Sequence, residues 1–83
     1  MTGTQNVRFT DRFKVGDKLL NGATLLAVEP DREGRRWVVL AQYGRDYVTW
    51  RCCGEGHCYW GEYARDIVTA AAGFQRRVHG RGI

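Results

Sequence analysis

The distribution of apolar and polar residues predicts a series of short strands in the first half of the chain. Residues 37–43, Trp-Val-Val-Leu-Ala-Gln-Tyr, are rich in the β-branched and aromatic side chains that favour strands. Residues 23–29 resemble a largely buried strand, and residues 13–20 carry a shorter, interrupted apolar alternation. Turn sequences separate these segments and lie at residues 21–22, 30–34 and 44–46.

A second pair of apolar segments, residues 47–53 and 58–63, predicts a hairpin closed by the four-residue loop 54–57. With that loop length, Cys53 faces Cys58 and Trp50 faces Gly61. One face of the hairpin is then apolar, with the Trp50 ring covering the gap left by Gly61. The other face is mixed, and there Arg51 is expected to lie on an exposed Trp60 ring. A one-residue slip would exchange the faces of one strand.

The C-terminal part changes to a helical period. Ile67, Ala71, Phe74 and Val78 recur at spacings of four, three and four residues, and Asp66 is the expected N-cap. Gly80 and Gly82 are expected to end the helix. The sequence therefore predicts an α+β fold, in which an antiparallel meander of four to five strands is covered by one C-terminal helix. A partly open SH3-like barrel with an appended helix is the main variant.

The chain of 83 residues is long enough for one domain. We expect residues 1–10 to be a flexible N-terminus, residues 11–79 to form a single α+β domain, and residues 80–83 to be a basic C-terminal tail. The longest apolar run, residues 37–41, is far shorter than the roughly 20 residues of a membrane span. The polar N-terminus lacks the apolar region of a secretory signal, so a cytoplasmic location is expected.

The net charge of +4 suggests nucleic acid until its distribution is considered. All nine acidic residues and ten of the 13 basic ones lie within residues 1–75, so the body of the chain is nearly neutral. The remaining basic residues are Arg76, Arg77 and Arg81. Positive side chains are favoured at the C-terminal end of a helix, which gives Arg76 and Arg77 a structural reason for their position.

The three cysteines lie close together, at Cys52, Cys53 and Cys58. An odd number is a poor disulfide framework, and in a cytoplasmic protein we expect free thiols. Together with His57 they place four possible zinc ligands within seven residues. A structural zinc site usually has a second ligand pair further along the chain, which is missing here, so we expect no metal. A catalytic Cys–His pair is disfavoured because no third orienting group is evident.

Five segments of the chain together resemble a known group of proteins. They lie at residues 14–17, 21–28, 38–41, 47–50 and 59–63, and the most specific are Tyr-Val-Thr-Trp at 47–50 and Tyr-Trp-Gly-Glu-Tyr at 59–63. The group consists of small uncharacterised proteins of bacteriophages and mobile elements in high-GC Gram-positive bacteria. The resemblance implies a small accessory protein in the cytoplasm of the host cell. It implies no enzymatic activity.

Of the three classes of function considered, protein binding is the leading hypothesis. An enzyme is not expected, because the titratable residues do not suggest a catalytic site and so short a chain leaves little room for a pocket; no cofactor is expected either. Tyr, Trp and Arg are enriched at interface hot spots. The candidate binding residues are Trp37, Tyr43, Arg45, Tyr47, Arg51 and Trp60. The expected partner is a host protein, or a second copy through the sheet; nucleic acid bound by the exposed aromatics and arginines is the alternative.

Overall fold

A computed structural model describes residues 8–31 and 36–79 of the chain. Its elements, in order, are α1 (Phe9–Arg12), β1 (Thr24–Pro30), β2 (Trp37–Tyr43), β3 (Asp46–Cys52), β4 (Cys58–Ala64) and α2 (Ile67–His79). The expected basic tail at 80–83, the glycines expected to end the helix, and most of the expected flexible N-terminus lie outside the described residues.

The four strands form one antiparallel sheet in the order β1-β2-β3-β4, so each strand pairs with its neighbour in sequence. The predicted α+β meander with a C-terminal helix is confirmed. The sheet is open, with β1 and β4 at its two edges, rather than closed into a barrel. Residues 13–20 contribute an isolated bridge between Lys18 and Thr24 instead of a fifth strand.

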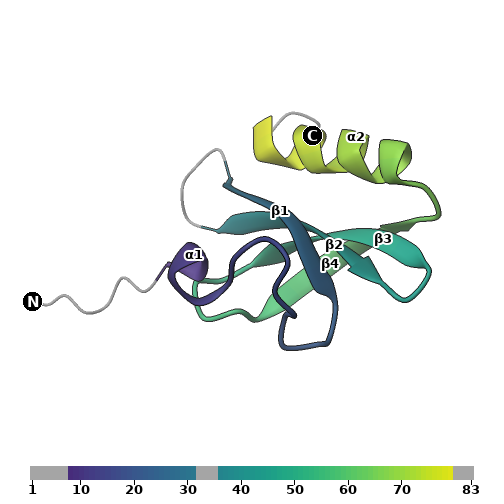
Figure 1. The fold of residues 1–83 in the computed structure, drawn as a ribbon. Helices are drawn as coiled ribbons and strands as arrows, with labels where there is room; N and C mark the ends of the chain where they lie inside the picture. Colours follow the sequence, from purple (N-terminus) through teal and green to yellow (C-terminus); the bar gives the residue numbers. More distant parts are fainter. Residues whose placement is uncertain (1–7, 32–35, 80–83) are drawn as a thin grey trace, which may run out of the picture.

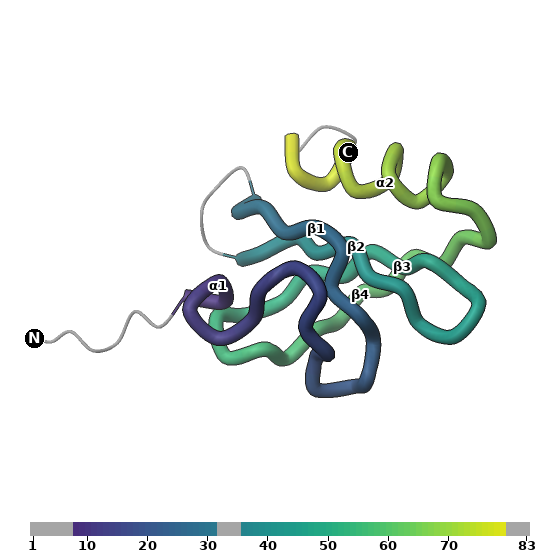
Figure 2. The backbone as a smooth tube through the Cα atoms, in the orientation of Figure 1, coloured from purple at the N-terminus to yellow at the C-terminus, as the bar shows by residue number. Residues whose placement is uncertain are grey.

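Each face of the sheet has its own core, because successive side chains of a strand point to opposite faces. On one face, Val39, Val48 and Trp50 pack with Phe9 and Phe13 of the N-terminal segment. The opposite face is covered by α2, which lies across the sheet in Figure 1. Figure 2 shows the same arrangement along the backbone, with α1 and α2 on opposite sides of the strands. The interior strands β2 and β3 are therefore buried from both sides.

The N-terminal segment enters the fold earlier than its polar sequence predicts. Phe9 is fully buried, and its ring lies 4.9 Å from that of Phe13, centroid to centroid. Burying a phenylalanine side chain contributes about 1.5–3 kcal/mol. Phe9, which the sequence predicts to lie in the N-terminal segment outside the domain, is therefore part of the core.

The β3–β4 hairpin follows the predicted register at one end and departs from it at the other. As predicted, Val48 faces Tyr63 and Thr49 faces Glu62. Beyond them Arg51 faces Tyr59 and Cys52 faces Cys58, so the predicted pairing of Cys53 with Cys58 is wrong. The cause is a β-bulge, in which Trp60 and Gly61 together stand opposite Trp50.

Helix α2 begins as its sequence predicts. Asp66 is its N-cap, because one carboxylate oxygen accepts the Thr69 backbone N–H at 2.8 Å and the other accepts the Thr69 hydroxyl at 3.0 Å. These hydrogen bonds hold the pKa of Asp66 below its ordinary value. The packed face is made by Ala70, Gly73 and Phe74, whereas Ile67, predicted to belong to it, is exposed.

Candidate functional site

The six candidate binding residues are spread over both faces of the sheet and do not form one surface. Trp37 is half-buried on the N-terminal face, where its ring lies 6.4 Å from that of Phe9. Tyr47 is half-buried on the opposite face and packs with the core beneath α2. These two side chains are mainly occupied in packing.

Two more candidates lie around the β2–β3 turn. Tyr43 is exposed at the end of β2 and makes an edge-on contact with the Trp50 ring, at 6.1 Å between centroids. Tyr63 makes a similar contact with Trp50 at 6.3 Å. The ring of Trp50 also lies over Gly61, as predicted: a Cβ on that glycine would come within 2.6 Å of the indole nitrogen. Arg45 is exposed in the turn itself.

Trp60 is the most exposed of the candidate aromatic residues. It occupies the bulge of β4 with a φ of 58°, in the left-handed region that non-glycine residues seldom adopt. Its side chain is 67% exposed and meets the Tyr59 ring edge-on, with centroids 4.9 Å apart. The bulge therefore turns a large apolar side chain out of an edge strand.

Arginines lie close to these aromatic side chains. The guanidinium of Arg36 lies over the Tyr59 ring, 5.8 Å from its centroid. Arg51 stands opposite Tyr59 in the ladder and forms an ion pair with Asp31 at 3.5 Å. The bulge moves Trp60 out of register, so Arg51 stands opposite Tyr59 and not opposite Trp60 as predicted. We call Arg36, Arg51, Tyr59 and Trp60 the β4 surface.

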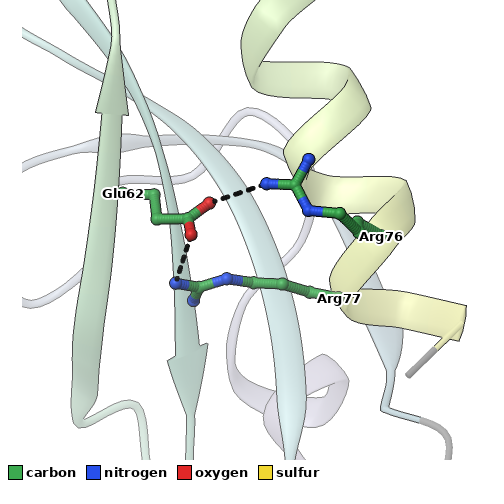
Figure 3. Close-up of polar contacts among 3 residues, drawn as sticks. All are labelled: Glu62, Arg76 and Arg77. Carbon is green, nitrogen blue, oxygen red and sulfur yellow. Dashed lines mark hydrogen bonds and ion pairs between the residues drawn. The ribbon is translucent and has the colours of Figure 1, made fainter. Parts of the chain in front are cut away.

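Next to the β4 surface, one carboxylate of β4 holds two arginines of α2. Figure 3 shows Glu62 between Arg76, which donates to one carboxylate oxygen at 3.4 Å, and Arg77, which approaches the other at 3.6 Å. Burial lowers the pKa of Arg77. The negative charge of Glu62 raises this pKa, whereas repulsion from Arg51 and Arg76 lowers it further. Arg77 stays charged, and its Nη1 atom is buried without a hydrogen-bond partner among the described residues.

A small cavity of about 160 Å³ lies between α2 and the sheet at this point. Its lining combines small apolar residues of β4 and α2 with the charged pair Glu62 and Arg76. Thr49, also in the lining, is 1% exposed, and its hydroxyl makes no hydrogen bond with the described residues. The space exists because Gly73 has no side chain: a Cβ there would stand 3.3 Å from Glu62 Oε1.

The sequence prediction missed this cluster of Thr49, Glu62, Arg76 and Arg77. It assigned the two arginines to the solvated end of a helix, which their position alone favours. Their contact with Glu62, 14 and 15 residues earlier, depends on where α2 crosses the sheet. The alternation of β4 does place Glu62 on the α2 side, and that is the only signal available before the packing is known.

The cysteines differ from the expected free thiols. Cys52 and Cys58 form a disulfide, while Cys53 is free and half-buried. The pairing follows from the bulge, which places Cys52 rather than Cys53 opposite Cys58. Two of the four candidate zinc ligands are thereby bonded to each other. Within residues 8–31 and 36–79, no three His, Cys, Asp or Glu side chains gather as a metal site would require.

No family model matches this chain, and the comparisons with curated proteins and with solved structures likewise gave no match. Within the described part of the chain, no helix has the length and apolar character needed to cross a membrane.

Proposed function

We propose that this protein is a small, non-enzymatic protein-binding module that contacts its partner through the β4 surface. The observation that carries the proposal is Trp60, a large apolar side chain that is 67% exposed and held in a left-handed bulge. Following the resemblance to phage and mobile-element proteins, we propose that the partner is a host protein whose activity is modulated by occupation of its surface.

The energetics of Trp60 support a binding role. The left-handed conformation costs a non-glycine residue roughly 1–2 kcal/mol. With Trp60 67% exposed, the burial of its ring contributes about the same amount, so the conformation brings the fold no net gain in stability. Strained residues of this kind concentrate at functional positions. Tryptophan beside arginine and tyrosine is also the combination most enriched among interface hot spots.

Affinity capture from a lysate of the host bacterium tests the proposal. The wild-type chain is compared with Trp60→Ala and with Val68→Ala, a control that truncates another exposed apolar residue on α2. We expect a protein to be retained by the wild type and by Val68→Ala, and its recovery to fall at least tenfold with Trp60→Ala. Equal recovery by all three chains would show that the β4 surface does not bind the partner.

Nucleic-acid binding is the second candidate, favoured by the position of Arg36 over Tyr59. Aromatic rings that stack on bases, flanked by arginines, are typical of single-strand binders. Against it, residues 1–75 are nearly neutral overall, with ten basic and nine acidic residues. We expect weak or no binding to DNA or RNA at physiological salt. A sub-micromolar complex whose affinity falls steeply with salt would favour nucleic acid over protein.

A further inference from the structure

We infer that the partner contributes an extended acidic segment, which pairs along the outer edge of β4 and places one carboxylate beside Arg76 and Arg77. This inference rests on the proposed protein-binding function and specifies what the partner presents. Three features support it: the unpaired strand edge, the cavity between β4 and α2, and the charge of the Glu62 cluster.

The first feature is the backbone of β4. This strand pairs with β3 on one side and is the last strand of the sheet on the other. Among the described residues, its backbone groups make no hydrogen bond with any segment except β3. An unpaired edge is a ready template for an added strand. The bulge at Trp60 and Gly61 ends the regular part of the edge, which leaves residues 62–64 available for pairing.

The second feature is the cavity between β4 and α2. Every second side chain of a strand added to β4 would point to the α2 side of the sheet, where the cavity lies. Its volume of about 160 Å³ is close to that of an engineered cavity, about 150 Å³, that accommodates benzene. One side chain of the added strand therefore fits. The buried hydroxyl of Thr49, without a partner among the described residues, offers that side chain a hydrogen bond.

The third feature is the charge. Arg76 and Arg77 share the single carboxylate of Glu62, and Arg51 adds further repulsion on Arg77. A second carboxylate would give Arg76 and Arg77 one counter-ion each. Hydrogen bonds between charged groups are stronger than those between neutral groups. A phosphate of a nucleic acid would pair with the same arginines, but it would leave the edge of β4 unpaired. An acidic peptide can pair with the edge and also supply a carboxylate to the arginines.

A displayed library of random seven-residue peptides provides the probe. We expect selection on the wild-type protein to enrich peptides that contain an Asp or Glu, with β-branched residues at the positions that alternate with it. Replacing the acidic residue by its amide should weaken an enriched peptide about tenfold. In NMR spectra, the peptide should shift the backbone amides of residues 62–64. Enrichment without acidic residues, or shifts confined to other strands, would overturn the inference.

Two variants test the site itself. Gly73→Ala narrows the cavity at Glu62 and should weaken the enriched peptide about tenfold, while also favouring the helix. Gln75→Ala changes an exposed residue of the same helix and should leave binding unchanged. If a captured partner is lost with Trp60→Ala but retained fully with Gly73→Ala, the proposed function stands and this inference falls. If Trp60→Ala also retains the partner, the function itself falls.

Discussion

Replacing Trp60 by alanine and by glycine separates the contribution of its side chain from that of its backbone. Both substitutions remove the ring, but only glycine adopts a φ near 58° without steric cost. If Trp60 serves binding rather than folding, both variants should remain folded. The glycine variant should then be the more stable of the two.

The magnitudes follow from exposure and conformation. With the side chain 67% exposed, about one third of a ring that buries roughly 150–250 Å² is covered. At about 25 cal/mol per Å², losing that contact costs about 1–2 kcal/mol in either variant. Glycine then recovers roughly 1–2 kcal/mol of left-handed strain. It loses about 0.5–1 kcal/mol of this through greater freedom of the unfolded chain. The net advantage over alanine is about 1 kcal/mol.

The measurement is unfolding in urea or by heat, followed by circular dichroism. A difference of 1 kcal/mol corresponds to about 4–8 °C in Tm for a domain of this size. Trp50→Ala is the buried control, because truncating a core tryptophan costs about 3–5 kcal/mol. A glycine variant less stable than the alanine variant would refute the strained bulge. A loss with Trp60→Ala as large as with Trp50→Ala would make Trp60 a core residue.

Three further predictions concern the elements that hold this surface in place. Asp66→Ala should lower the Tm at neutral pH. Because the folded-state pKa of Asp66 is depressed, the difference should shrink as the pH falls below the ordinary value of about 3.9 and vanish below the folded-state pKa. Phe74→Ala should cost about 3–5 kcal/mol in urea unfolding, since Phe74 anchors α2 to the sheet; a loss under 1 kcal/mol would mean that α2 does not pack there. Reduction with dithiothreitol should destabilise the chain by about 2 kcal/mol, the expectation for a loop of this length. Cys53→Ser should respond in the same way, whereas Cys58→Ser should be insensitive to the reductant.

The strands could be predicted from the sequence because their signals are local. Residues 37–43 are bounded as predicted, since a β-branched and aromatic run stands between two turn sequences. The covering of Gly61 by Trp50 was also predictable, because it depends only on the pairing that starts from Val48 and Tyr63. Both predictions rest on alternation and on near neighbours in the chain.

The bulge was not predictable in the same way. Trp60 is a strand-forming residue, and nothing in its type signals a positive φ. The extra residue on β4 nevertheless places Cys52 rather than Cys53 opposite Cys58. Cys52 and Cys58 then form a disulfide, where free thiols were predicted. The Glu62 cluster escaped prediction for a different reason, because it needs the position of a helix relative to a strand, which no local pattern contains.

The bulge also explains why the proposed binding residues lie along β4 rather than across all the exposed aromatic residues. On one side of Trp60 the ladder is fixed by the pair Thr49 and Glu62, and on the other by the disulfide at Cys58. Glu62 also holds the arginines of α2, so the strand that presents Trp60 is tied to the helix that borders the cavity. Because the backbone is held on both sides of Trp60, this residue loses little backbone freedom on binding, which favours affinity. The same bulge limits the regular open edge to residues 62–64, so an added strand is expected to pair there. Trp60 and Glu62, which lines the cavity, therefore lie two positions apart on one strand whose backbone is held on both sides of the bulge.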